Sequence, residues 1–380
     1  MEIRNRHLFR LTRFVIFKIS FLFRLMAKFR RAKKRLLIIK TDAIGDYILL
    51  RNFIELVKGS EKFRDHEIHL LGNPAWRDIA LTYDSAFVSE FIFVKDNELY
   101  ESPFKLLKLG WKLFRNNYEV VLQPTSTRRL INDGLAALTA AKQLITFEGN
   151  TTGILPKYKA KTDKLYTRLL PLPNDIYFEF DRNVFYFEQV LDEMPAIGGP
   201  YIQTKATDRT GIIIFPGAGS VKRGWEKEKF FNLLELIMAK TSQPVYITGG
   251  PAETATAKYL VDHLPGTNIT DLTGKTSLPQ LVEMIGSANL LISNETSAIH
   301  IAAATKTPSV CILGGGHFER FAPYPEHMDY RPVCVYEKME CYNCNWNCIY
   351  QTPPNAPYPC ISIVTVEQVW KAIGSMVHWP

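Results

Sequence analysis

Short β-rich runs alternate with amphipathic stretches along most of this chain, in two successive series. The first series has β-rich runs at residues 36–40, 67–72, 90–94 and 118–124, with helical stretches such as 47–58 and 103–115 between them. The second has runs at 211–217, 244–248, 268–270, 289–293 and 309–313, with helical stretches at 227–240, 254–263, 278–287 and 298–305. Strands that alternate with helices form parallel sheets with right-handed crossovers. The pattern predicts an α/β fold with two doubly wound sheets.

The two series are separated by a segment of different composition. Residues 191–210 read LDEMPAIGGPYIQTKATDRT and are rich in Pro, Gly and polar residues. A chain of 380 residues is long enough for two domains, each with its own core. We predict an N-terminal segment, a first domain, a linker, a second domain and a final helix with its tail. Their bounds, in this order, are 1–35, 36–190, 191–208, 209–365 and 366–380.

The N-terminal segment carries the chain's excess positive charge. Residues 1–35 contain 12 Lys or Arg and one acidic residue, Glu2, which gives the segment a net charge of +11. The whole chain has +8, so the remainder has −3. That remainder has no basic stripe with interleaved aromatic residues, and nucleic acid is therefore not an expected partner.

The same segment has an amphipathic pattern. At helical spacing, one apolar face would carry Phe9, Ile16, Ile19, Phe23 and Met26. Lys18 and Arg24 keep the uncharged runs to four or five residues, whereas a spanning helix needs about 20 apolar ones and a secretory signal needs an unbroken stretch. We predict a cytoplasmic protein, peripheral on the inner face of the cytoplasmic membrane, whose helix lies on the anionic surface. The alternative is an ordinary amphipathic helix that packs on the protein.

Ligands of open α/β sheets bind at the carboxyl ends of the strands, so the loops after the β-rich runs are the candidate sites. The first such loop, residues 40–46, includes Lys40 and Thr41 and ends in Gly45 and Asp46. Gly45 would permit a tight turn, and Asp46 at the start of a helix would be ionised and able to accept a proton. The alternative is that Asp46 only caps that helix.

A loop of the second series has residues suited to binding phosphate. Residues 215–225 read FPGAGSVKRGW, in which three small residues precede two cations and a helix. Backbone N–H groups can approach phosphate oxygens where side chains are small, and Lys222 can neutralise their charge. The loop lacks the spacing of a P-loop or of a dinucleotide fingerprint.

Two further loops of the second series add polar groups. Residues 248–253 form a Gly-Gly turn that places Glu253 where a carboxylate could accept hydrogen bonds from ribose hydroxyls. In residues 293–304, Thr296 or Ser297 can cap the helix that follows, and His300 lies one turn further along. A lone helical histidine is more often structural than a ligand.

These loops, in this order and together with residues 272–281, resemble glycosyltransferase family 9, the ADP-heptose:lipopolysaccharide heptosyltransferases, over about residues 36–372. The resemblance implies the GT-B fold, in which an N-terminal acceptor domain and a C-terminal nucleotide-sugar domain, both Rossmann-like, face a cleft. It implies that Asp46 is the catalytic base and that Lys222 binds the donor diphosphate. Gly224 interrupts the family's Lys-Arg-Trp sequence. Glu295 and Ser297 stand where the family has Asp and Gly.

The resemblance also implies an activity: an inverting, metal-independent glycosyltransferase without a cofactor. It would move heptose or another sugar from a nucleotide-diphosphate donor, such as ADP-heptose, to the lipopolysaccharide core or a related lipid-linked cell-surface glycan. The expected donor-binding residues are Gly217, Ala218, Gly219, Ser220, Lys222, Glu253, Glu295, Thr296, Ser297 and His300.

Two other functions fit parts of the sequence. One is a membrane-attached nucleotide-sugar-binding protein without transfer activity, although a pure binder would have no use for the base of the Gly45-Asp46 pair. The other is a nicotinamide-dependent enzyme, which is disfavoured because neither half has the glycine fingerprint.

All six cysteines lie in the last quarter of the chain. Four of them, Cys341, Cys344, Cys348 and Cys360, match a cysteine cluster seen in many members of the family and could hold zinc tetrahedrally. We expect reduced structural cysteines and no metal, because the predicted compartment is reducing.

Overall fold

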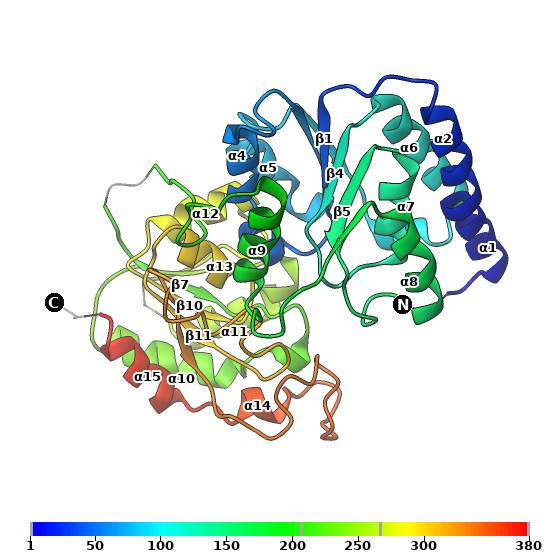
Figure 1. The fold of residues 1–380 in the computed structure, drawn as a ribbon. Helices are drawn as coiled ribbons and strands as arrows, with labels where there is room; N and C mark the ends of the chain where they lie inside the picture. Colours follow the sequence, from blue (N-terminus) through cyan, green and yellow to red (C-terminus); the bar gives the residue numbers. More distant parts are fainter. Residues whose placement is uncertain (1–2, 206–207, 266–267, 378–380) are drawn as a thin grey trace. The chain divides into compact units, whose positions relative to one another are not determined.

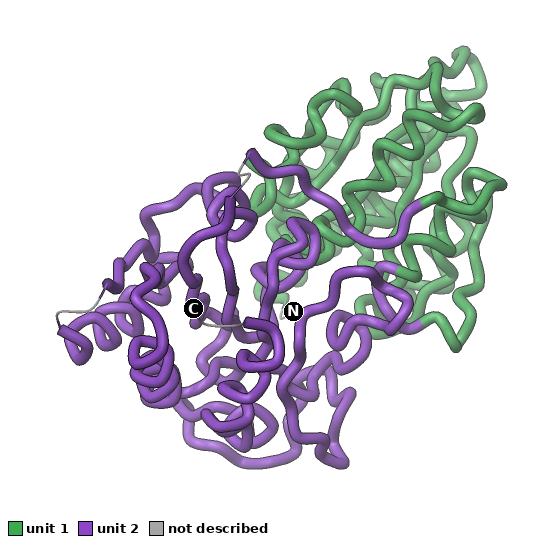
Figure 2. Tube along the Cα trace, turned by 90° about the vertical axis from the view of Figure 1, so that its left-hand side faces the viewer, with its two compact units in different colours: residues 1–176, 181–196 green, residues 177–180, 197–380 purple. Residues whose placement is uncertain are grey.

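A computed structural model describes residues 3–205, 208–265 and 268–377 (Figure 1). Parts of four predicted segments lie outside the described residues: residues 1–2 of the N-terminal segment, 206–207 of the linker, 266–267 of the second domain and 378–380 of the tail. The chain divides into two compact units, coloured separately in Figure 2. Unit 1 comprises residues 1–176 and 181–196, and unit 2 comprises residues 177–180 and 197–380.

Unit 1 contains a six-stranded parallel sheet in the order β3-β2-β1-β4-β5-β6. Its strands are β1 (Arg35–Lys40), β2 (Glu67–Gly72), β3 (Glu90–Phe93), β4 (Val120–Gln123), β5 (Gln143–Phe147) and β6 (Arg168–Leu170). β1 is buried from Leu36 to Lys40, as expected for a central strand with helices on both faces. The strand order reverses between β1 and β4, where such sheets usually bind ligands.

The helices of unit 1 that follow the N-terminal segment are α3 (Ile44–Ile48), α4 (Asn52–Gly59), α5 (Arg77–Tyr83), α6 (Pro103–Asn116), α7 (Leu130–Leu138), α8 (Pro156–Thr162) and α9 (Glu179–Leu191), whose first two residues are counted in unit 2. α6 begins with Pro103, whose fixed φ suits the first helical position. It ends at Asn117, whose φ of 57° is left-handed and stops the helix. α7 is buried along its whole length, which explains why its sequence is mostly small and apolar.

The N-terminal segment of unit 1 is helical from residue 6 to residue 27. It consists of α1 (Arg6–Phe14), a π-helical turn (Val15–Ile19) and α2 (Ser20–Ala27). Four members of the predicted apolar face (Phe9, Ile16, Ile19 and Phe23) pack into the unit 1 core, and Met26 is exposed. A Cβ at Gly134 of α7 would lie 2.6 Å from Ile16. Glycine at this position therefore lets the N-terminal segment pack closely against α7. Among the described residues, no helix is long and apolar enough to cross a membrane.

Unit 2 repeats the topology with a six-stranded parallel sheet in the order β12-β11-β10-β7-β8-β9. The strands are β7 (Ile212–Phe215), β8 (Val245–Ile247), β9 (Ile269–Asp271), β10 (Leu290–Asn294), β11 (Ser309–Ile312) and β12 (Val333–Val335). The helices are α10 (Lys227–Met238), α11 (Thr254–His263), α12 (Leu278–Gly286), α13 (Ser297–Ala304), α14 (Pro359–Ser362) and α15 (Val366–Gly374). The last helix packs Val369 and Ile373 into the core of this unit.

The predicted pair of doubly wound parallel sheets is confirmed. Nine of the described strands lie inside a predicted β-rich run or within one residue of it, whereas β5, β6 and β12 were not predicted. The predicted helix over residues 47–58 was inaccurate, because α3 ends at Ile48 and α4 begins at Asn52.

Candidate functional site

The strand order of unit 2 reverses between β7 and β10, and one side chain joins the loops at that point. Asn294, the last residue of β10, donates from Nδ2 to the carbonyl oxygen of Pro216 (2.7 Å) and to that of Gly217 (3.3 Å). Its Oδ1 accepts from the backbone N–H of Trp225 (3.0 Å). A fully buried amide therefore fixes both ends of the loop that follows β7. The sequence analysis gave Asn294 no role.

A cavity of about 540 Å³ lies against this loop. Its lining includes Gly217, Ala218, Gly219 and Ser220, together with Glu253. A Cβ at Gly217 would lie 3.0 Å from the Glu253 carboxylate, so the absence of a side chain lets these two predicted site residues meet. Gly219 has a left-handed φ of 67° and open space beside its Cα. The loop thus presents bare backbone to the cavity, as phosphate binding requires.

Several buried polar atoms near this point have no hydrogen-bond partner within the described part of the chain. They are Oε2 of Glu295, Nε of Arg223, Nε1 of Trp346 and Oγ1 of Thr248. Thr248 follows β8 and Glu295 follows β10, so both lie at carboxyl ends of the sheet. The Arg223 guanidinium lies over the Trp346 ring at 4.2 Å from its centroid. Buried polar groups normally find partners, so the unpaired atoms of Glu295 and Arg223, which influence each other electrostatically, indicate a place for a polar ligand or water.

Glu295 and Arg223 influence each other electrostatically. Burial raises the pKa of Glu295 to about 7, and the positive charge of Arg223 offsets this only in part. Burial also lowers the pKa of Arg223 below its usual range, although Glu295 acts in the opposite direction. Glu295 thus changes protonation near neutral pH and can donate or accept a hydrogen bond there.

Lys222 lies on the same loop but points to different partners. Its Nζ donates to the carbonyl oxygens of Thr352 (3.0 Å) and Pro353 (2.6 Å) and to the Thr352 hydroxyl (2.6 Å). The ammonium group therefore holds a C-terminal loop in this structure. Its contact with a donor diphosphate stays a prediction.

The α13 region contains the remaining predicted residues of unit 2. Thr296 is the N-cap of α13 and its Oγ1 accepts from the N–H of Ala298 (3.3 Å), while Ser297 is the first helical residue. His300 is buried, and its Nδ1 lies 2.9 Å from the Tyr324 hydroxyl. Burial lowers the pKa of His300 to about 4, so the ring is neutral at pH 7. The hydrogen bond to Tyr324 is a structural role of the kind that is common for helical histidines.

In unit 1 the corresponding loops are filled with ion pairs. The fully buried Nζ of Lys40 lies 3.1 Å from Oδ2 of Asp42, and Arg129 lies 3.0 Å from Asp96 and 3.9 Å from Asp42. Thr41 donates to Asp96 (3.2 Å) and accepts from Asn132 (2.7 Å). Burial alone would raise the pKa of Asp42, but Lys40 and Arg129 lower it below the usual range. The predicted residues Lys40 and Thr41 thus have partners inside the protein.

Asp46 is half-buried in the first turn of α3, and Gly45 precedes it in the same helix. The N-cap of α3 is Ala43, so Asp46 is not the N-cap residue. The expected tight turn at Gly45 is not found, because Gly45 is helical and is not one of the described glycines with a positive φ. The role of Asp46 as a base stays a prediction.

The cysteine cluster lies in unit 2. All six cysteines are free thiols, and Cys341, Cys344 and Cys348 are half-buried while Cys360 is buried. Burial raises the pKa of Cys341, and the neighbouring Cys344 and Cys348 raise it further. Within the described ranges, no three His, Cys, Asp or Glu side chains are arranged to hold a metal ion.

Comparison with known proteins gives a family match in the second half of the chain. Residues 191–346 match the family model of glycosyltransferase family 9 (heptosyltransferase). Lipopolysaccharide heptosyltransferase 3 of Escherichia coli K12 is 29% identical over 130 residues, which span 34% of this chain and only 38% of that relative. Lipopolysaccharide heptosyltransferase 1 of Campylobacter coli is 22% identical over 302 residues, which span 74% of this chain and 84% of that relative.

A solved structure has the same fold. The E. coli heptosyltransferase WaaC with ADP-2-deoxy-2-fluoro heptose superimposes with a TM-score of 0.67 at 17% identity, covering 90% of this chain and 100% of that one. Residues 191–346 thus match the model of glycosyltransferase family 9, and the chain is similar in fold to a solved heptosyltransferase.

Proposed function

We propose that this protein is a glycosyltransferase that moves a sugar from a nucleotide-diphosphate donor to a glycan acceptor. The observation that carries the proposal is the point of unit 2 where the strand order reverses. There, a loop of small residues lines a cavity of about 540 Å³, and Arg223 and Glu295 have buried polar atoms without partners among the described residues. A nucleoside diphosphate offers anionic oxygens to such a loop and hydroxyls to carboxyl groups such as Glu253.

The proposed reaction inverts the anomeric carbon. Asp46 takes the proton from the acceptor hydroxyl, whose oxygen bonds to the anomeric carbon as the bond to the diphosphate breaks. Backbone N–H groups of residues 217–220 and a cation of the same loop stabilise the charge on the leaving diphosphate. Arg223 and Lys222 are the two candidate cations, and Arg223 is favoured because Lys222 is already bound to Thr352 and Pro353. If these groups carry the charge, the reaction proceeds without a divalent metal.

The identity of the sugar rests on the named relatives. These are lipopolysaccharide heptosyltransferases, and one solved structure contains an ADP-linked heptose analogue. We therefore propose ADP-heptose as the donor and the lipopolysaccharide core, or a related lipid-linked glycan, as the acceptor. Such an acceptor would place the reaction at the inner face of the cytoplasmic membrane.

The donor can be tested with thermal-shift measurements against ADP-, GDP-, UDP- and TDP-sugars. A ligand that binds only the folded protein adds about 2.7 kcal/mol of stability at 100 times its dissociation constant. We expect the ADP-sugar to raise the melting temperature most. We also expect transfer to the acceptor, measured by mass spectrometry, to continue in the presence of a metal chelator. Stabilisation by none of these sugars would contradict the proposal.

Replacing Asp46 separates an enzyme from a protein that only binds nucleotide sugars. Asp46→Asn keeps the shape of the side chain and removes its basicity, so we expect transfer to fall by about 10²–10⁴-fold with donor affinity retained within a few-fold. The control is Asp65→Asn, an exposed carboxylate of the same unit, which should transfer normally. Normal transfer by Asp46→Asn would show that the base lies elsewhere. Absence of transfer by the unmodified protein, with donor binding intact, would favour the binding protein.

A further inference from the structure

The N-terminal helical segment has a second apolar face, distinct from the one that packs on unit 1. Seven large apolar side chains on this face are exposed: Leu11, Phe14, Phe21, Leu22, Leu25, Met26 and Phe29. Phe14, Phe21 and Phe29 are 55%, 61% and 92% exposed. Most of the seven recur at intervals of three or four residues, which places those of α1 and α2 near one side of the helical segment, and Phe29 follows the end of α2. Scattered exposed apolar residues are ordinary, but a continuous strip of this kind marks an interaction surface.

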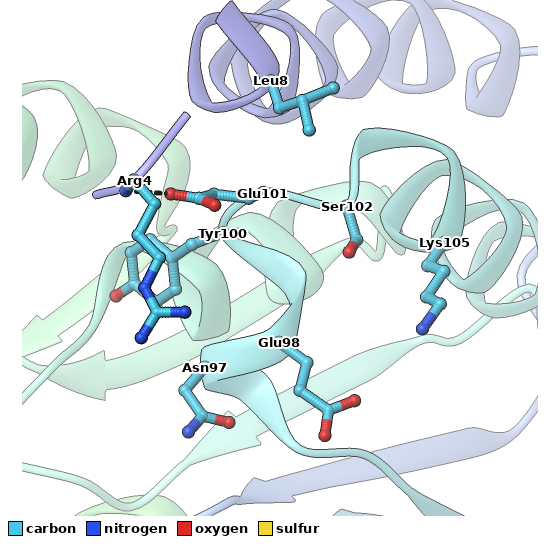
Figure 3. A pocket seen from close by; sticks show the side chains of 8 residues that line it. All are labelled: Arg4, Leu8, Asn97, Glu98, Tyr100, Glu101, Ser102 and Lys105. Atoms are coloured by element: carbon cyan, nitrogen blue, oxygen red, sulfur yellow. Dashed lines mark hydrogen bonds between the residues drawn. The ribbon is translucent and has the colours of Figure 1, made fainter. Parts of the chain in front are cut away.

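The segment that carries this strip is firmly attached to unit 1. Backbone N–H groups of Arg4 and Asn5 donate to the Glu101 carboxylate, and Figure 3 shows the Glu101 side chain directed at Arg4. Arg13 donates to the Tyr158 hydroxyl (3.0 Å), and Arg24 donates to the carbonyl oxygen of Leu165 (2.8 Å). The inner face is buried in the core, so the outer strip is a fixed surface of the folded unit.

The charged side chains of the segment itself have one sign. Residues 3–34 contain no Asp or Glu, and Arg10, Lys18, Lys28 and Arg31 have exposed side chains. Lys18 lies between Phe14 and Phe21 on the same helical side. Cations on flexible stems can extend past an apolar strip to reach phosphate groups at the level of lipid headgroups.

We propose that this outer strip docks on an anionic lipid bilayer, with the segment lying in the headgroup region and Phe14, Phe21 and Phe29 inserted among the acyl chains. The proposal goes beyond the sugar transfer and does not depend on it. It also differs from the sequence prediction, in which the membrane face included Phe9, Ile16, Ile19 and Phe23, because those side chains are used inside unit 1. A second copy of the chain is a poorer occupant, because pairing this face with itself would bring together two basic segments that have no acidic residue between positions 3 and 34.

Vesicle sedimentation of the full-length protein tests the proposal. We expect binding to vesicles of equal parts phosphatidylglycerol and phosphatidylcholine, and much weaker binding to phosphatidylcholine alone. The double variant Phe21→Ser/Phe29→Ser should bind at least about tenfold more weakly, since each phenylalanine loses its transfer into the apolar phase. The double variant Lys18→Gln/Lys28→Gln should lose about fivefold per charge and become less sensitive to salt. The control Ile349→Ser removes an exposed apolar side chain of unit 2 and should bind normally.

The outcomes separate the possible occupants of the strip. All variants change exposed side chains, so their melting temperatures should match that of the unmodified protein. Failure of the unmodified protein to bind the mixed vesicles would overturn the proposal, as would unchanged binding by the phenylalanine variant. A dimer in sedimentation velocity that the phenylalanine variant dissociates, without vesicle binding, would assign the strip to a second copy. The lysine variant remains an independent test if the phenylalanine variant does not fold.

Discussion

Units 1 and 2 have the same strand order, yet the loops at the carboxyl ends of their central strands are built differently. In unit 1, Lys40, Asp42, Asp96 and Arg129 form ion pairs with one another. In unit 2, Glu295 and Arg223 have buried polar atoms without partners among the described residues. The shared topology therefore does not determine the polar chemistry of the loops. That chemistry comes from a few side chains placed after the strands.

The difference has a functional meaning. Leaving a buried polar group unpaired costs about 1–3 kcal/mol, so a folded protein retains such groups where a ligand supplies the missing hydrogen bonds. Unit 1 also has such an atom at this position, Oδ1 of Asn132, but in unit 2 the unpaired atoms belong to the charged side chains Glu295 and Arg223, which suit a polar ligand. The side chains of unit 1 at the same topological position mainly stabilise the fold, apart from the proposed role of Asp46.

The largest expected effect concerns the stability of unit 1. Arg128 and Asp133 form a fully buried pair at 2.8 Å, and Gln123 and Tyr166 also donate to Asp133. Asp133→Ala would leave these donors without their acceptor, and we expect a loss of about 3–5 kcal/mol in the free energy of unfolding, measured with denaturant. Asp65→Ala, which breaks an exposed pair with Lys34, should cost less than about 1 kcal/mol. A small loss for Asp133→Ala would mean that unit 1 does not depend on its internal ion pairs.

A smaller effect is expected at Glu295 of unit 2, and it depends on pH. The folded-state pKa is about 7, whereas an unfolded glutamate titrates near 4.3. The folded protein therefore holds a proton that the unfolded chain has lost, and stability falls as the pH rises from about 4.3 through 7. Glu295→Gln cannot ionise, so its stability relative to the unmodified protein should rise by about 3 kcal/mol between pH 4.5 and pH 8. A difference that is constant across this range would show that Glu295 is already ionised at low pH.

The two sheets and most of their strands were predictable from the sequence, because buried parallel strands are short apolar runs between helical stretches. β5, β6 and β12 were missed. β6 and β12 are three-residue edge strands, as is β9, which the sequence did predict, so strands of this length are recognised inconsistently. The division at residues 48–52 was missed because both short helices share one amphipathic pattern.

The candidate site was predictable in its loops but not in its hydrogen bonds. The small residues 217–220 and Glu253 line one cavity as expected, since they follow adjacent strands. The sequence could not indicate that Lys222 binds the carbonyls of Thr352 and Pro353, which lie 130 residues away along the chain. Asn294 and Arg223 could have been noticed, because Asn294 is the polar last residue of β10 and Arg223 lies in the loop after β7, and both strands are central in unit 2.

The N-terminal segment shows the same limit of sequence reasoning. Its apolar residues predict an amphipathic helix, but a helix with two apolar faces does not reveal which face meets the protein. Ile16 packs on the inner face because Gly134 has no side chain there. This contact joins distant parts of the chain, so the local sequence does not reveal it.

The central claim is that the unpaired groups of unit 2 bind the diphosphate of a nucleotide sugar. Calorimetric titration of ADP into the unmodified protein, Arg223→Met and Lys222→Met tests it most directly, because methionine keeps the apolar stem and removes only the cation. Hydrogen bonds to charged groups contribute about 1.5–3 kcal/mol, so Arg223→Met should weaken ADP about 10–100-fold, while Lys222→Met should change it by less than about threefold. Full affinity in Arg223→Met, or no ADP binding by the unmodified protein, would contradict the claim.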